Sequence, residues 1–163
     1  MKFIVDCMLG KLAKWLKILG FDTLYFSKIE DSDFVRLAKQ EERVILTRDN
    51  GLIEKSGKMK KLFIESENWK IQVKQVLDAF NLWEKVNPNS RCIECNVLLK
   101  DLPKRKARNL VTPFVYERAE SFALCPNCQR IFWQGTHFQD MEYKIQEIFK
   151  RKERAGLSGD ERS

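Results

Sequence analysis

The chain has 163 residues, of which 44% are apolar and 33% are charged. This composition excludes collagen-like, coiled-coil and disordered chains. The sequence also lacks the run of about 20 apolar residues that a membrane helix needs and the apolar block of a signal peptide. The net charge of +7 favours a polyanionic partner without identifying one. We therefore expect a cytoplasmic protein of one or two small domains, with no membrane partner.

The first 85 residues alternate apolar strand-like runs with helical periodicity, which predicts an α/β fold with a parallel sheet. The expected strands lie at residues 2–6, 23–26, 44–47 and 61–65. A helix that ends at Gly20 is expected after the first strand, and a second helix begins near Asp31 or Ser32. A short helix or turn follows Asp49, and a last helix spans about 69–80.

Residues 84–91 interrupt this pattern with Pro88 and a run of polar side chains, and two cysteine pairs follow. We place a domain boundary there. Residues 1–86 form the α/β domain, and residues 91–150 form a cysteine module with a C-terminal helix from about residue 138. Residues 151–163 are expected to be a flexible tail.

Three acidic residues follow the first three strands: Asp6, Asp31 and Asp49. Since the carboxyl ends of parallel strands meet at one edge of a sheet, we expect these carboxylates to lie together. Their oxygens suit Mg²⁺ or Mn²⁺, which would neutralise their mutual repulsion. Asp33 is an alternative to Asp31.

Each of these acids has a simpler explanation, because an Asp after a strand often caps a helix or forms a turn. No other catalytic motif competes with the acid set. The sequence contains no glycine-rich nucleotide loop and no nucleophile elbow, and its single histidine cannot supply a histidine-rich site.

Four of the five cysteines form two C-x-x-C pairs: Cys92 with Cys95, and Cys125 with Cys128. Two such pairs make a four-thiolate site, which favours a structural Zn²⁺ because the closed shell leaves no open position. A mononuclear iron is the second choice. We expect Cys7, in the first strand region, to be a small apolar filler that points into the sheet.

Basic side chains form two groups. Lys11, Lys14 and Lys17 recur every three residues on the first helix, and a second cluster consists of Lys104, Arg105, Lys106 and Arg108. Each group alone is typical of a solvated surface. Together they would flank an acidic metal edge, which is the arrangement that a phosphodiester substrate needs.

Aromatic residues surround His137 in the sequence FWQGTHF. They could stack on an unpaired base, although filling a small core is the commoner use of such rings. Thr47 and Arg48 directly precede Asp49 and are further candidates for contact with nucleic acid.

Four separated motifs carry a resemblance: VDCMLGKLAKWLKILGFDT, RVILTRDNGL, RCIECNVLL and CPNCQRIFWQGTHFQDM. In this order they resemble the PIN-like ribonuclease domain family named after the C-terminal region of the nematode mut-seven protein. The likeness extends to about Met141. It implies a PIN-like sheet with helices on both faces, a C-terminal zinc ribbon and metal-dependent cleavage of RNA.

The resemblance also implies roles for single residues. Asp6, Asp31 and Asp49 correspond to the family's site acids, and Thr47 to a hydroxyl residue two positions before the third acid. Glu65 or Glu67 could supply a further acid. The four paired cysteines fit the ribbon ligands, and His137 fits a W-x-G-[ST]-H element.

These observations lead to one hypothesis and two rivals. The hypothesis is a metal-dependent ribonuclease that hydrolyses RNA and uses the zinc ribbon to help bind it. The main rival is a non-catalytic RNA-binding or ribosome-associated adaptor with the same fold. A receiver-like phosphoacceptor ranks last, because a receiver has no use for a zinc ribbon.

Overall fold

The computed structural model describes residues 1–157, without the side chains of residues 136, 137, 152 and 154–157. The chain divides into two compact units between Asn96 and Val97. This division lies after the first C-x-x-C pair, whereas composition placed it at residues 84–91. The reason is a set of hydrogen bonds that hold residues 87–96 on the first unit.

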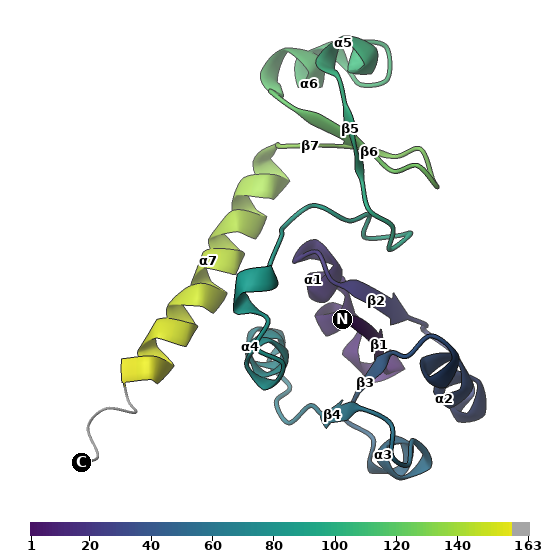
Figure 1. Cartoon of the computed structure of the whole chain (residues 1–163). Coiled ribbons are helices and arrows are strands. Elements are labelled where there is room, and N and C mark those ends of the chain that lie inside the picture. Colours follow the sequence, from purple (N-terminus) through teal and green to yellow (C-terminus); the bar gives the residue numbers. More distant parts are fainter. Residues whose placement is uncertain (158–163) are drawn as a thin grey trace. The chain divides into compact units, whose positions relative to one another are not determined.

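The first unit is built on a four-stranded parallel sheet with the order β2-β1-β3-β4 (Figure 1). The strands are β1 (Lys2–Val5), β2 (Asp22–Tyr25), β3 (Val44–Thr47) and β4 (Lys61–Phe63). The helices are α1 (Gly10–Ile18), α2 (Asp31–Gln40), α3 (Asn50–Lys55) and α4 (Trp69–Ala79), with 3-10 turns η1 (Cys7–Leu9) and η2 (Trp83–Lys85). The α/β fold class with a parallel sheet is confirmed.

Helices cover both faces of this sheet. The neighbouring residues Phe3 and Ile4 of β1 point to opposite faces, and each packs against helices or the residues next to them. The Phe3 ring lies 5.8 Å from the ring of Phe80, which directly follows α4. Ile4 belongs to the opposite core cluster with Phe34 of α2 and Leu52 of α3. Because the central strands are covered on both sides, every residue of β3 is buried and the strand reads as a continuous apolar run.

Residues 87–96 are attached to the first unit by backbone and side-chain hydrogen bonds. The backbone amides of Asn87 and Asn89 donate to the carbonyls of Leu19, which caps α1, and of Ile18, its last residue. Gly20 allows this close return, since its φ is +95° and a Cβ there would lie 2.5 Å from the Asn87 carbonyl oxygen. The segment ends at Asn96, whose side-chain oxygen accepts from the backbone N–H of Thr23 in β2 at 2.9 Å.

A buried ion pair ties three strands at the opposite end from the predicted acids. The Arg43 guanidinium, 6% exposed, donates to Asp22 at 2.7 Å, to Glu41 at 2.7 Å and to the carbonyl of Phe3 at 3.1 Å. The Asn96 amide donates to the same Asp22 oxygen at 2.7 Å. Burial alone raises the pKa of Asp22, but the hydrogen bonds from Arg43 and Asn96 outweigh it and hold the pKa below its ordinary value.

The second unit contains an antiparallel sheet of three short strands with the order β5-β6-β7 (Figure 1). These are β5 (Lys100–Leu102), β6 (Phe122–Leu124) and β7 (Ile131–Trp133). Helices α5 (Lys104–Ala107) and α6 (Pro113–Arg118) lie between β5 and β6 in the sequence. A small core in this unit consists of Ala107, Ala119 and Phe122.

Helix α7 (Thr136–Leu157) completes the described chain. It begins two residues before the expected helix and continues beyond residue 150. Of the predicted tail at 151–163, residues 158–163 lie outside the described residues. Over the described chain, no helix combines the length and the apolar composition needed to cross a membrane.

The Asp22 network yields a stability prediction. Asp22→Ala should lower the free energy of unfolding by about 1–3 kcal/mol at neutral pH, because it removes an acceptor from the buried guanidinium of Arg43. Since the folded-state pKa of Asp22 is lowered, its contribution is complete above a pH of about 4 and is lost as the pH falls through the folded value. Urea unfolding at several pH values measures this difference.

The matched control is Asp33→Ala, which removes an exposed i,i+3 pair with Arg36 and should cost at most about 1 kcal/mol. Equal losses for the two variants, or a loss for Asp22→Ala that does not shrink in acid, would contradict the assignment.

Candidate active site and metal centre

The strand order places Asp6 and Asp49 at the point where the sheet changes direction. The chain leaves β1 toward β2 on one side and returns to β3 on the other, so the connections diverge between β1 and β3. In open α/β sheets, ligands bind outside the carboxyl ends of the strands at such a point. Asp6 directly follows β1, and Asp49 lies two residues after β3.

A single hydroxyl connects these two acids. Thr47, which has no exposed surface, donates from Oγ1 to Asp6 Oδ2 at 2.8 Å. The same Oγ1 accepts from the backbone N–H of Asp49 at 2.9 Å. Asp6 is itself only 8% exposed, and Asp49 Oδ1 accepts from the Gly51 N–H at 2.7 Å as the cap of α3. The two acids therefore lie at one edge in fixed orientations.

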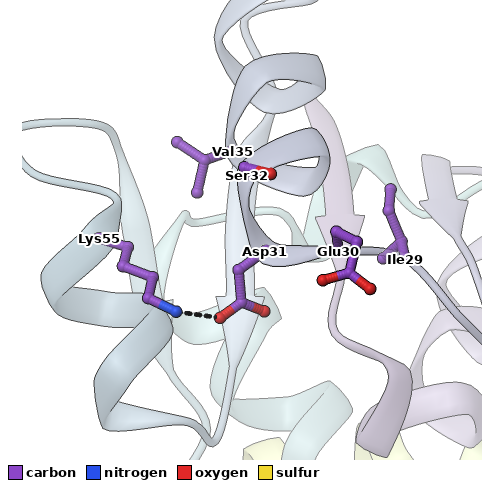
Figure 2. A pocket seen from close by; sticks show the side chains of 6 residues that line it. All are labelled: Ile29, Glu30, Asp31, Ser32, Val35 and Lys55. Atoms are coloured by element: carbon purple, nitrogen blue, oxygen red, sulfur yellow. Dashed lines mark hydrogen bonds and ion pairs between the residues drawn. The ribbon is translucent and has the colours of Figure 1, made fainter.

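Asp31 is held by a lysine that the sequence analysis did not single out. It lies in the first turn of α2, and its Oδ2 is 2.6 Å from Lys55 Nζ at the end of α3. Figure 2 shows this ion pair, with Glu30 nearby, at a pocket of about 530 Å³. The hydrogen bond from Lys55 to Asp31, followed by the charges of Asp31, Asp49 and Glu30, raises the pKa of Lys55. The same ammonium therefore interacts with Asp31 and Asp49.

The acids approach one another less closely than the cysteines do. Among the side chains that the structure describes, Asp6, Asp31 and Asp49 do not form a group whose ligand atoms all lie within 4.8 Å of one another. Asp33, the alternative to Asp31, pairs with Arg36 on the surface at 2.7 Å. Of the two further acids, the Glu67 side chain is 93% exposed and lies 3.8 Å from Arg48, and the backbone N–H of Glu65 donates to Gln75. The acid set remains a prediction.

The three lysines of α1 have different surroundings. Lys11 Nζ lies 5.2 Å from the centre of the Trp69 ring, which stacks on Trp15 at 4.5 Å. Lys17 is half-buried and donates to the Ile93 carbonyl at 3.1 Å. Lys14 is exposed and, in the described part of the chain, has neither a hydrogen bond nor an ion pair.

The other basic candidates lie on two surfaces. Arg48 Nη1 is buried and, within the described chain, has no hydrogen-bond partner. In the second unit, the three basic side chains of α5 and that of Arg108 just after it are exposed, and Lys104 Nζ lies 5.2 Å from the centre of the Tyr116 ring. These exposed cations are Lys104, Arg105, Lys106 and Arg108. His137 belongs to the first turn of α7, and its side chain lies outside the described residues.

The four paired cysteines form a compact group. The Sγ atoms of Cys92, Cys95, Cys125 and Cys128 all lie within 4.8 Å of one another. Both turns have the same local structure, since the N–H of the second cysteine donates to the Sγ of the first at 3.4 Å. The residue after each pair, Asn96 or Gln129, has a positive φ of 61° or 63°. This repeated turn and the all-sulfur donor set fit a tetrahedral Zn²⁺.

The prediction for Cys7 was wrong. Cys7 lies in η1 and is exposed, so it does not fill the sheet. A hydrogen bond with Asp6, together with burial and the Asp6 charge, raises the pKa of the Cys7 thiol. Cys7 also lies outside the group of four cysteines.

The cysteine group leads to a metal-removal experiment. The protein should carry about one zinc per chain, and Cys128→Ser should lower both the zinc content and the thermal stability, because bound structural zinc contributes to folding. Elemental analysis and thermal unfolding measure the two effects. Cys7→Ser is the matched control and should retain full zinc content, while iron in place of zinc in the purified protein would overturn the choice of metal.

Comparison with known families gives one match. Residues 1–145 match the model of the Mut7-C RNAse domain, a span that includes the three acids and all four paired cysteines. No curated protein and no solved structure matches the chain significantly. The resemblance seen in the four motifs is confirmed, and the chain belongs to the Mut7-C RNAse domain family.

Proposed function

We propose that this protein is a metal-dependent ribonuclease that hydrolyses RNA phosphodiester bonds at the carboxyl edge of its parallel sheet. Membership of an RNAse domain family supports nuclease activity and RNA as the substrate. The observation that carries the proposed site is the Thr47 hydroxyl, which joins Asp6 to Asp49 at the point where the strand connections diverge.

The donor set suits a hard divalent cation. Mg²⁺ is commonly bound by one or two carboxylates together with water and substrate phosphate, so Asp6 and Asp49 could hold it without a complete protein cage. When bound, Mg²⁺ or Mn²⁺ would supply an activated water and neutralise charge on the leaving oxygen. Asp31 is the third proposed acid, and its shared interaction with Lys55 supports a place near Asp49.

Lys55 compensates the negative charge of the acid edge in this arrangement. Its side chain is 59% exposed, so it can leave Asp31 at little cost when another cation or an RNA phosphate approaches. Thr47 keeps the Asp6 carboxylate in one orientation, because its hydroxyl hydrogen is donated to that carboxylate. These residues position the acids.

Phosphate contacts are proposed for the cations near this edge and for the second unit. Arg48 directly precedes Asp49, and its guanidinium, which lies 3.8 Å from the exposed Glu67 carboxylate, could form a charge-assisted hydrogen bond to a phosphate. The exposed cations of the α5 cluster would help the zinc ribbon to bind RNA. We place the enzyme in the cytoplasm, where thiols remain reduced and available to zinc.

The catalytic assignment is tested with the acid variants. Asp6→Asn, Asp31→Asn and Asp49→Asn should each lower the rate of RNA cleavage by on the order of 100-fold or more, since loss of a residue that merely orients a metal ligand already costs 10–100-fold. Binding of RNA to Asp49→Asn should persist or tighten, because a carboxylate near the phosphates is removed. Cleavage with Mn²⁺ or EDTA and binding by fluorescence anisotropy are measured side by side.

Asp33→Asn is the matched control and should cleave RNA at the wild-type rate. If Asp33→Asn loses cleavage of RNA and Asp31→Asn does not, then Asp33 is the third site acid in place of Asp31. Cleavage at the wild-type rate by Asp49→Asn would show that the active site is elsewhere, and RNA binding without cleavage under any metal would favour the adaptor.

The role of Thr47 is tested by an isosteric change. Thr47→Val keeps the buried shape but removes the bond to Asp6, so both Mn²⁺ affinity and cleavage should fall by about 10–100-fold. Thr47→Ser retains the hydroxyl and should recover most of the loss. Calorimetric titration with Mn²⁺ separates a positioning effect from simple destabilisation, and unchanged Mn²⁺ affinity in a folded Thr47→Val protein would reject this role.

A further inference from the structure

A groove of about 260 Å³ lies in the first unit beside α1. Its walls come from three segments that are distant in sequence. Gly10, Lys14 and Lys17 belong to α1, Tyr25 ends β2, and Ile93 and Glu94 lie between the two cysteines of the first pair.

One end of the groove adjoins the proposed catalytic edge. Tyr25 pairs with Val5 in the parallel register of β1 and β2, and Val5 directly precedes Asp6. The Tyr25 hydroxyl donates to the carbonyl of Cys7, the residue after Asp6, at 2.9 Å. This bond places the phenol ring beside the backbone that carries the first acid.

The other end is closed by the first cysteine turn. Lys17 donates to the Ile93 carbonyl, and burial lowers the pKa of the Lys17 ammonium. From Gly10 to Lys17, α1 rises about 10 Å. The α1 residues of the groove therefore span about two helical turns.

The side chains along the groove indicate which class of ligand it can bind. Lys17 is committed to Ile93, whereas Lys14 is exposed and, over the described residues, has no hydrogen bond or ion pair. An uncommitted lysine beside an aromatic ring is the combination by which proteins bind unpaired nucleotides. Duplex RNA is contacted differently, across successive minor grooves over about 16 base pairs.

The absence of a side chain at Gly10 lets the Tyr25 phenol pack closely against α1. A Cβ on Gly10 would lie 2.9 Å from the Tyr25 hydroxyl oxygen, so the phenol would have to move. The backbone at Gly10 is helical, with φ −56° and ψ −37°, so an alanine there is compatible with α1. Gly10→Ala therefore changes the groove while leaving the helix intact.

We propose that this groove binds unpaired RNA next to the phosphate that is cleaved, with Lys14 on a backbone phosphate and the Tyr25 ring against a base. The inference rests on the proposed function for the position of the cleaved phosphate. It also gives the first cysteine turn a direct part in forming the RNA site.

The test measures binding of a short fluorescein-labelled oligouridine to the zinc-loaded full chain, in an Asp49→Asn background that does not cleave it. Lys14→Ala should weaken binding and lower the slope of log affinity against log salt by about one unit. Tyr25→Leu should weaken binding by about 5- to 150-fold through lost stacking, while Tyr25→Phe keeps the ring and should bind nearly as the parent. Gly10→Ala, which displaces the phenol, should also bind more weakly.

Lys39→Ala is the matched control, because it removes one exposed lysine from α2, away from the groove. Equal effects of Lys14→Ala and Lys39→Ala would overturn the proposal, as would equal affinity for a duplex of the same length. Crosslinks from 4-thiouridine RNA should map to the Tyr25 peptide, and crosslinks confined to the Trp69 peptide would place the strand on the opposite side of α1.

The outcome for the groove is separate from the outcome for the catalytic site. Loss of binding in Lys14→Ala and Tyr25→Leu, in a protein that never cleaves RNA, would support the groove and reject the nuclease. Cleavage of RNA by the wild type, together with unchanged binding in both variants, would support the nuclease and reject the groove.

Discussion

The hydroxyl of Thr47 is the interaction on which the proposed site depends. It donates to the nearly buried carboxylate of Asp6 and accepts from the backbone N–H of Asp49 at the same edge of the sheet. A buried carboxylate without a donor would be costly, and β3 supplies that donor from within its own last residue. The strand that completes the centre of the sheet therefore also fixes the geometry between Asp6 and Asp49.

Both ends of the sheet use charge in a fixed arrangement, but for different purposes. At the amino ends of the strands, Asp22 accepts hydrogen bonds from Arg43 and from Asn96, and Arg43 also donates to Glu41 and to the Phe3 carbonyl. At the carboxyl ends, Lys55 is exposed although it pairs with Asp31, and Arg48 retains a buried nitrogen without a partner in the described chain. Polar networks in which every donor and acceptor is paired stabilise the fold, whereas networks with an unpaired donor are typical of sites where a ligand binds.

The central strands could be predicted well because burial on both faces leaves a continuous apolar run, as in VILT of β3. The cysteine group was equally predictable, since two C-x-x-C turns encode their own local geometry. The position of Lys55 could not be predicted, because no motif links the end of α3 to the start of α2. Tyr25 was missed for a related reason: its proximity to Cys7 follows from strand register and helix packing.

The contact between Asn96 and β2 has a consequence for the protein in its metal-free form. β2 is an edge strand, and unpaired N–H groups of such strands are templates for pairing with another chain. The side chain of Asn96 covers one of these groups, at Thr23, and Asn96 owes its positive φ to the turn around Cys92 and Cys95. If the four cysteines bind zinc, loss of the metal would loosen this turn and expose the N–H of Thr23, so the metal would also protect the edge of β2 against pairing with a second chain.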